Sequence, residues 1–287
     1  MYTRDLFKSG AITRGCPALK KRIVITNDDG VYSPGLKMLH DSVSDLGEVH
    51  VIAPETPKSS TGLGLTLHKP LRVMRVKLWN EKSIIAVSGT PSDIIHISVH
   101  ILNGKPDLVL SGINVGDNTS LQVILSSGTV GAAMQASLLG IPSVAFSADV
   151  KSPEEFMRRN YRRALEIVTR TIAEHLLEKG MPKGFDLISV NFPSVIGKKT
   201  KVKIAKPARI RFAQYTERRI DPQGRPYFWI YGEPTSPEEG TDAYIVLVEK
   251  NIALTPISLN LSSCSGSEDD AEPLRERAEE NLREKML

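Results

Sequence analysis

Short apolar runs, each followed by turn residues, recur along the first two thirds of the chain. Five of them are predicted strands, over residues 22–26, 48–53, 107–111, 142–146 and 186–190. Their apolar residues are nearly continuous rather than alternating, which is typical of parallel strands buried on both faces. The pattern therefore predicts a buried parallel sheet.

Helical patterns lie between these strands, and three of them have recognisable N-termini. Ser33-Pro34 and Thr90-Pro91 each place a hydroxyl before a proline at the first helical position. A capping box, Ser152-Pro-Glu-Glu155, begins a long helix that is expected to end near Lys179. Strands that alternate with helices predict βαβ units with right-handed crossovers, so we expect an α/β fold with a mostly parallel sheet.

The pattern changes in the last third of the chain. Residues 201–212 and 227–231 are predicted antiparallel strands around the turn cluster Asp221-Pro-Gln-Gly224, and a further strand is expected over residues 243–249. Residues 268–285 carry eight acidic and four basic side chains with few apolar anchors. That composition is typical of a solvated helix or a tail.

Composition excludes several classes of protein. Of the 287 residues, 40% are hydrophobic and 24% are charged, close to the averages of globular proteins, which excludes wholesale disorder, collagen and coiled coil. No apolar run approaches the roughly 18 residues of a membrane-spanning helix, so we expect no membrane association. The net charge of +4 is too small to indicate a polyanionic partner by itself.

Cysteine usage and the N-terminus favour a cytoplasmic protein. Cys16 and Cys264 are the only cysteines, too few for a disulfide framework or a four-ligand zinc site, and they suit a reducing compartment. Residues 1–21 lack the apolar core of a signal peptide. We interpret them as a loose N-terminal extension.

Two adjacent carboxylates follow the first predicted strand, in Asn27-Asp28-Asp29-Gly30. Inside a strand they would point to opposite faces, but a turn after the strand allows both to converge. Convergent carboxylates repel each other unless a cation lies between them, so the pair indicates a metal site. An ordinary Asp-Gly turn that caps the next helix is the alternative interpretation.

Two other polar, glycine-rich loops follow predicted strands, over residues 54–62 and 111–118. In open α/β sheets, ligands bind outside the carboxyl ends of the strands, so we expect these loops to meet the acidic turn at one edge. Together they would supply carboxylates, a hydroxyl and an amide oxygen, without Cys or His. An oxygen-only ligand set favours Mg²⁺ or Mn²⁺ over Zn²⁺.

A further glycine-rich segment, Ser126-Ser-Gly-Thr-Val-Gly-Ala-Ala133, runs into a predicted helix of small residues. Helix N-termini bind phosphate because their free N–H groups and the helix dipole both favour an anion. A plain N-cap with close helix packing is the alternative. The segment is neither a Walker A loop nor a Gly-x-Gly-x-x-Gly fingerprint, so nothing indicates triphosphate or dinucleotide binding.

The ordered set of motifs resembles the SurE family (survival protein E), which are metal-dependent 5′-nucleotidases, from about residue 22 to residue 256. The motifs that carry this resemblance are Thr26-Asn-Asp-Asp-Gly30, Ala53-Pro54, Ser88-Gly-Thr-Pro91, Ser111-Gly-Ile-Asn-Val-Gly116, Ser127-Gly-Thr-Val130, Asp221-Pro-Gln-Gly224 and Gly240-Thr-Asp242. The resemblance implies a Rossmann-like fold with a protruding β-hairpin and a C-terminal segment used in oligomer contacts. The corresponding parts of the chain are an N-terminal extension (1–21), a Rossmann-like catalytic domain (22–196), a β-hairpin extension with a return strand (197–256) and a charged C-terminal tail or helix (257–287).

The same resemblance implies one divalent cation per subunit, Mg²⁺ or Mn²⁺. Its ligands would be Asp28, Asp29, Ser59 and Asn114. Lys58 stands where the family often has arginine, and the adjacent Ser60 leaves the ligand serine ambiguous by one position.

The implied reaction is hydrolysis of nucleoside 5′-monophosphates to nucleoside and phosphate by a homodimer or homotetramer. The candidate catalytic residues are Asp28, Asp29 and Asn114. The candidate phosphate- or substrate-binding residues are Asn27, Gly30, Ser127, Gly128 and Thr129. An in-line water is the preferred nucleophile with Asp28 exchanging a proton, and direct attack by Asp28 is the less favoured route.

Other interpretations remain open at this stage. Residues 198–225 hold ten basic and two acidic side chains, so a nucleotide- or RNA-binding protein without hydrolysis is the main alternative, although a solvated hairpin and no nucleic-acid partner is favoured. A phosphatase with an aspartyl-phosphate intermediate is less favoured because the usual Asp-x-Asp pattern is absent. His96 and His100 have helical spacing, but they lack the glutamate of a zinc-protease motif, so we assign them a packing or surface role.

Overall fold

The computed structural model describes residues 20–79, 82–261, 272–273 and 275–279. Contacts divide the chain into two units, Met1–Ile257 and Ser258–Leu287, and each is described by itself. Most of the N-terminal extension and both cysteines lie outside the described residues. Among the described residues, no helix is both long and apolar enough to cross a membrane. In the second unit, residues 272–273 and 275–279 are helical and exposed.

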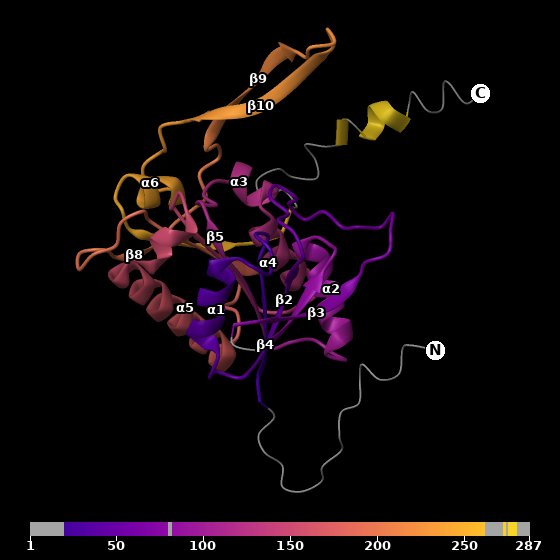
Figure 1. Ribbon diagram of the computed structural model, residues 1–287. Helices are drawn as coiled ribbons and strands as arrows, with labels where there is room; N and C mark the ends of the chain where they lie inside the picture. Colours follow the sequence, from indigo (N-terminus) through magenta and orange to yellow (C-terminus); the bar gives the residue numbers. More distant parts are fainter. Residues whose placement is uncertain (1–19, 80–81, 262–271, 274, 280–287) are drawn as a thin grey trace, which may run out of the picture. The chain divides into compact units, whose positions relative to one another are not determined.

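A nine-stranded sheet forms the centre of the first unit (Figure 1). Its strand order is β3-β4-β2-β1-β5-β6-β7-β11-β8. The strands from β4 to β7 in this order are parallel, whereas β3 pairs antiparallel with β4 and β11 pairs antiparallel with β7. In chain order the strands are β1 (Arg22–Thr26), β2 (Glu48–Pro54), β3 (Val73–Leu78), β4 (Lys82–Val87), β5 (Leu108–Val115), β6 (Ser143–Ala148), β7 (Leu187–Phe192), β8 (Val202–Ile204) and β11 (Ile252–Ile257).

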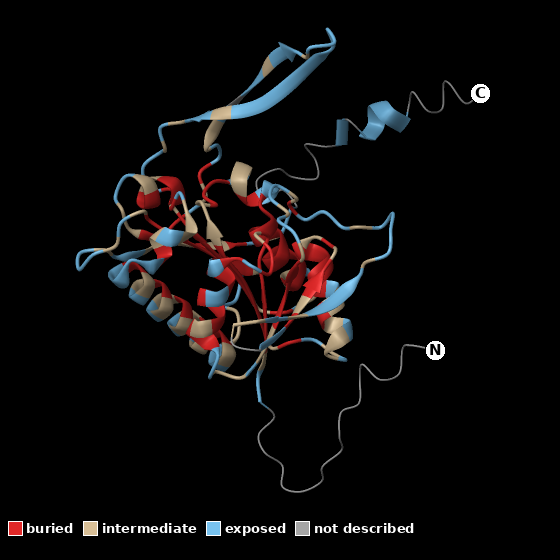
Figure 2. Ribbon diagram, viewed as in Figure 1, coloured by how far each residue is buried: buried red, intermediate tan, exposed pale blue. Residues whose placement is uncertain are grey.

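Helices cover both faces of the sheet. Helices α1 and α5 pack together on one face, and α2 and α4 pack together on the other. The strands between these two layers are the most deeply buried part of the unit (Figure 2). The helices are α1 (Pro34–Val43), α2 (Pro91–Ile101), α3 (Leu121–Ser126), α4 (Gly128–Leu138), the 3₁₀ helix η1 (Pro153–Met157), α5 (Arg159–Lys179) and α6 (Asp242–Leu247).

The predicted mostly parallel α/β fold is confirmed, and the five predicted strands are β1, β2, β5, β6 and β7. The observed N-termini of the helices agree in part with the predicted ones. Thr90 makes a capping box, in which Thr90 Oγ1 accepts a hydrogen bond from the Asp93 N–H at 3.1 Å and the Thr90 N–H donates to Asp93 at 2.8 Å. Ser33 begins α1 without a side-chain cap, and the single long helix expected from Ser152 is instead η1 followed by α5.

The predictions for the last third of the chain need correction. The strand expected over residues 243–249 is wrong: helix α6 forms there, because Thr241 Oγ1 accepts a hydrogen bond from the Tyr244 N–H and so caps a helix start. Within the range 201–212, where one strand was expected, only Val202–Ile204 forms a strand (β8). The next strand, β9, begins at Phe212, the last residue of that range. Strands β3 and β4 were not predicted at all.

A hairpin forms a second, two-stranded sheet. Strands β9 (Phe212–Ile220) and β10 (Pro226–Pro234) pair antiparallel through nine residues each, and the expected turn cluster connects them. Figure 2 shows that this hairpin is largely exposed. Phe228, Trp229 and Ile230 are 58%, 56% and 75% exposed, so its apolar side chains have little cover within the described part of the chain.

Candidate functional site

The centre of the candidate site is Asp28, which lies just beyond the carboxyl end of β1. Its carboxylate accepts hydrogen bonds from the Thr129 hydroxyl and from the backbone N–H groups of Gly128 and Thr129. These two residues open α4, so the helix N-terminus stabilises the ionised acid. Burial nevertheless raises the pKa of Asp28, because desolvation outweighs these hydrogen bonds.

Gly128 allows this close approach. A Cβ atom at position 128 would lie 2.8 Å from the Asp28 Cβ and 2.9 Å from Thr61 Oγ1. Any larger residue would have to displace one of these neighbours. The predicted glycine-rich segment therefore serves to bring α4 against the acidic turn.

Asp29, the second carboxylate of the turn, has a different environment. Burial and, to a smaller extent, the adjacent Asp28 together raise its pKa to about 6, although a hydrogen bond from the Val115 N–H acts in the opposite direction. Its Oδ2 atom is buried and accepts no hydrogen bond within the described part of the protein. A buried carboxylate oxygen without a partner, beside a second carboxylate, fits a ligand for a hard cation.

Asn114 is brought to the same edge by an irregularity in β5. The register with β6 shifts between Ser111 and Asn114, so the strand continues past the point where a loop was expected. Asn114 Nδ2 donates to the carbonyl oxygens of Gly116 and Val115, at 2.9 and 3.3 Å. These two hydrogen bonds fix the orientation of the amide. Its Oδ1 accepts no hydrogen bond among the described contacts, so it can serve as a neutral oxygen ligand.

The loop after β2 contributes the serine candidates. The Lys58 N–H donates to the Asp28 carbonyl oxygen at 2.7 Å, which joins this loop to the acidic turn. Ser59 and Ser60 are both exposed, and Ser60 has a left-handed backbone with φ of 58°. The structure thus places both serines next to the turn, and the choice of Ser59 stays a prediction.

Asn27 and Gly30 shape the acidic turn itself. Asn27 is fully buried; its Oδ1 accepts from the Gly30 N–H at 3.1 Å and its Nδ2 donates to the Gly30 carbonyl at 3.2 Å. Gly30 has φ of +93°, a region that favours glycine. Both residues hold the two aspartates in place, and their predicted contact with substrate stays a prediction.

The two candidate hydroxyls of the phosphate-binding segment differ in what they contact. Ser127 Oγ caps α4 by accepting from the Val130 N–H at 3.2 Å, which leaves its own hydroxyl proton available to a ligand. Thr129 is fully buried and its hydroxyl donates to Asp28. The geometry therefore gives Thr129 a partner within the protein, whereas Ser127 retains a free donor.

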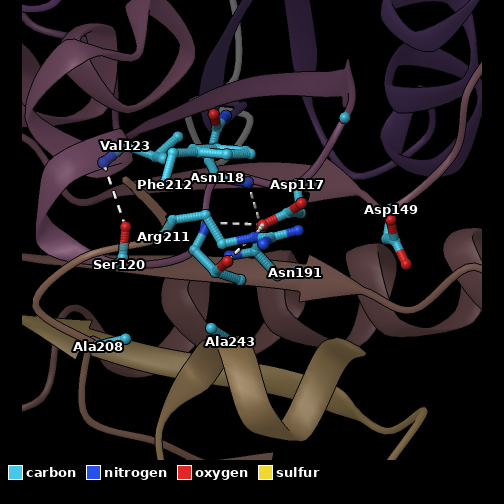
Figure 3. Close-up of polar contacts among 12 residues, drawn as sticks. Asp117, Asn118, Ser120, Val123, Asp149, Asn191, Ala208, Arg211, Phe212 and Ala243 are labelled. Carbon is cyan, nitrogen blue, oxygen red and sulfur yellow. Dashed lines mark hydrogen bonds and ion pairs between the residues drawn. The ribbon is translucent and has the colours of Figure 1, made fainter. Parts of the chain in front are cut away.

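Sequence reasoning missed the polar cluster that supports the loop after Asn114. Asp117 lies 3.7 Å from Arg211 Nε, and both side chains are nearly buried (Figure 3). The Asn118 N–H donates to Asn191 Oδ1 at 2.8 Å. Asp242 accepts from the N–H groups of Ser120 at 2.9 Å and of Ala208 at 2.8 Å. The Gly240-Thr-Asp242 motif was the available signal for this cluster.

Gln122 on α3 connects the base of the hairpin to the same loop. Its Oε1 accepts from the N–H groups of Arg211 and Phe212, at 3.0 and 2.9 Å, and its Nε2 donates to the Phe212 carbonyl at 3.0 Å. A single side chain therefore satisfies three backbone groups where β9 begins. No sequence motif indicates such a contact, because its partners are separated by about 90 residues.

A cavity of about 340 Å³ lies beside Asp29 and is also lined by Gly30, Tyr32, Glu55 and Val115. It opens at the carboxyl edge of the sheet, where ligands of open α/β sheets bind. Of the predicted ligands, Asp29 lines this cavity, and its carboxylate chemistry suits a hard cation.

Comparisons with known proteins identify the family. The family model described as "Survival protein SurE" matches residues 23–217. The 5′-nucleotidase SurE of Hyperthermus butylicus is 51% identical over 267 residues, covering 91% of this chain and 95% of that protein. The 5′-nucleotidase SurE of Thermofilum pendens is 54% identical over 239 residues, covering 83% and 91%. The crystal structure of SurE protein from Aquifex aeolicus superposes with a TM-score of 0.72 at 32% identity, covering 88% of this chain and 98% of that one. The chain therefore belongs to the SurE family.

Proposed function

We propose that this chain is a metal-dependent 5′-nucleotidase that hydrolyses nucleoside 5′-monophosphates to nucleoside and phosphate. The observation that carries the proposal is the buried Asp29 Oδ2, which has no hydrogen-bond partner among the described residues and lies beside Asp28. Relatives at 51% and 54% identity carry the name 5′-nucleotidase SurE, which supports the reaction class.

The proposed metal ligands are Asp28, Asp29, Ser59 and Asn114, holding one Mg²⁺ or Mn²⁺ ion. When bound, the cation would supply Lewis acidity toward a phosphate oxygen. Two carboxylates balance its 2+ charge, and the neutral serine and asparagine add no further negative charge, so the Lewis acidity of the cation would remain available to the substrate.

The protein's own groups then position the reaction. Asp28 is held by the Thr129 hydroxyl and the start of α4, so its carboxylate keeps one orientation. Asp28 is the proposed residue that exchanges a proton with an attacking water. Ser127, with its free hydroxyl proton, is the proposed donor to a phosphate oxygen, and Gly128 and Thr129 at the same helix start are proposed to act through Asp28.

The test is release of phosphate from AMP by the purified chain with Mn²⁺ and with EDTA. We expect turnover with Mn²⁺, none with EDTA, and at least a 100-fold loss of kcat/KM in Asp29→Asn. Activity that persists in EDTA would contradict metal dependence. Absence of turnover with every nucleoside monophosphate under Mn²⁺ and Mg²⁺ would contradict the nucleotidase assignment.

The RNA-binding alternative gains no support from the contacts. Of the ten basic side chains in residues 198–225, at least five form ion pairs with acidic residues. They are Lys203, Lys206, Arg211, Arg219 and Arg225. Paired cations are a weak clamp for a polyanion, so no nucleic-acid partner is proposed.

We further propose a homo-oligomer in which a second copy covers the β9–β10 hairpin. An isolated two-stranded hairpin is only marginally stable in water, and this one exposes Phe228, Trp229 and Ile230. Light scattering after size exclusion tests this directly, and a monomer at micromolar concentration would contradict it. A cytoplasmic location stays a prediction from the sequence.

A further inference from the structure

Strands β2 and β4 separate at the edge of the sheet opposite the acidic turn. They are paired only through Ile52–Pro54 and Ile85–Val87, so the first four residues of β2 have no partner in β4. A cavity of about 370 Å³ fills this gap between the two strands (strands labelled in Figure 1). The volume lies within the range of small-molecule sites.

Two imidazole and two cationic side chains line the cavity: His40, His50, Arg75 and Lys82. Arg75 and Lys82 are both exposed, and neither forms an ion pair with an acidic side chain in the described part of the protein. Two cations at one cavity without a carboxylate partner create a local positive potential that attracts an anion.

The cations approach from the two faces of the sheet. Lys82 alternates with Ser83, so it shares the face of Ile84, which packs in the core with α1. Arg75 lies directly opposite Ile85, and directly opposite residues share a face. Ile85 packs toward α2. A ligand in the gap would therefore meet one cation on each side.

His40 holds Lys82 in place. The His40 Nε2 atom lies 2.7 Å from Lys82 Nζ, and Nδ1 lies 3.2 Å from Asp41 Oδ1. Because the ammonium can only donate, Nε2 accepts and the ring proton is on Nδ1, facing Asp41. This arrangement requires neutral His40 and uses only one of the three Lys82 donors.

Two acidic groups described near the cavity, Asp41 and Glu48, each lie within ion-pair distance of a basic side chain. Asp41 pairs with Lys37 at 2.5 Å as well as with His40. Glu48 lies 3.2 Å from His50 Nε2, outside hydrogen-bond alignment, so that buried nitrogen keeps a vacant position. The His50 ring and both cations are thus available to one anion without displacing a carboxylate from Arg75 or Lys82.

We propose that the gap between β2 and β4 binds a phosphate group, either free or carried by a nucleotide. Arg75 and Lys82 would donate charge-assisted hydrogen bonds from opposite faces, and His50 would add a neutral donor. Trp79 forms part of the wall, with its ring centroid 5.4 Å from that of His40. This site is separate from the proposed catalytic edge and requires no hydrolysis.

Trp79 makes the proposal directly measurable. The chain has two tryptophans, so Trp229→Phe leaves Trp79 as the only indole reporter. Full-length protein in EDTA at constant ionic strength is titrated with inorganic phosphate, AMP and adenosine while its fluorescence is recorded. We expect a saturable change with inorganic phosphate or AMP, and none with adenosine at equal concentration. A response to both means that the free anion suffices, and a response to AMP alone identifies a nucleotide.

Charge removal locates the site. In the Trp229→Phe background, Arg75→Ala with Lys82→Ala should raise the half-saturating concentration at least 10-fold. The matched control is Arg163→Ala with Lys183→Ala, which removes the same charge from exposed positions elsewhere. It should leave the half-saturating concentration unchanged. Lys82→Gln, which keeps a donor for His40, gives a second variant if the double change lowers the melting temperature.

Three results would overturn the proposal. They are no saturable change up to 20 mM of either phosphate compound, an unaltered half-saturation in both the double variant and Lys82→Gln, or an adenosine response equal to that of AMP.

Discussion

Replacing Asp29 by asparagine should stabilise the metal-free protein while removing its activity. In the absence of a cation, the Asp29 carboxylate is buried beside Asp28, and its pKa rises to about 6 from an ordinary value of 3.8. A pKa shift of about 2 units corresponds to about 3 kcal/mol in the free energy of unfolding. Screening by solvent at this partly open site reduces the stabilisation expected from Asp29→Asn to about 1–3 kcal/mol. We expect Asp29→Asn to melt about 2–10 °C higher in EDTA at pH 7.5.

The pH dependence follows from the direction of the shift. A carboxyl whose pKa is raised by folding costs no stability while it is protonated in both states, below about pH 4. The cost grows as the pH rises through the interval between 4 and about 6, and it is complete above that. The difference in melting temperature between Asp29→Asn and the wild type should therefore be near zero at pH 4 and reach its full value above pH 7.

Calorimetry or thermal fluorimetry in EDTA across this pH range measures the effect. Asp45→Asn is the matched control: it makes the same change at an exposed carboxylate paired with Arg170, which holds the pKa of Asp45 low, so no stabilisation is expected. Adding Mn²⁺ should raise the melting temperature of the wild type and not that of Asp29→Asn. A variant less stable than wild type at pH 7.5 in EDTA, or a difference independent of pH, would refute the reasoning.

Three other predictions concern the site and the hairpin. Ser59→Ala should raise the Mn²⁺ concentration for half-maximal activity about 10-fold or more and Ser60→Ala much less; the reverse ranking in a metal titration would move the ligand by one position. Thr129→Val, which deletes the hydroxyl bonded to Asp28, should lower kcat/KM about 10- to 100-fold, while Thr129→Ser retains activity. A Thr129→Val variant that is destabilised but fully active would contradict a role of Thr129 in catalysis. Trp229→Glu should shift the protein toward monomer in light scattering, and an unchanged oligomer would exclude the hairpin from the interface.

The parallel core was predictable because its pattern is local. Strands such as β1 and β5 are continuous apolar runs, and parallel strands bring their carboxyl ends to one edge, so Asp28 and Asn114 could be placed together without coordinates. Strand β3 was missed because it lies at the edge, where residues such as Val73 and Met74 are about half exposed and the pattern of apolar positions is weak.

The local sequence pattern also gave a wrong prediction where helix capping competes with strand propensity. Residues 243–249 contain the β-branched pair Ile245 and Val246, which favours a strand, yet both are buried in helix α6. Thr241 caps that helix, and Asp242 binds the N–H groups of Ser120 and Ala208 from elsewhere in the chain. These long-range hydrogen bonds anchor the start of the capped helix, and no window of neighbouring residues contains them.

The start of α4 shows what a motif leaves open about chemistry. A glycine-rich turn into a helix predicts phosphate at the helix N-terminus, and this stays a prediction; in the structure the carboxylate of Asp28 accepts from the N–H groups of Gly128 and Thr129. The sequence does not distinguish an anion of the protein from a phosphate of a ligand, because both satisfy the same donors. Since Asp28 occupies those donors, the helix acts on a phosphoryl group chiefly through this acid, by fixing its orientation and supporting its charge. The motif therefore identifies the position of the site, while the identity of the bound anion depends on a residue 101 positions earlier.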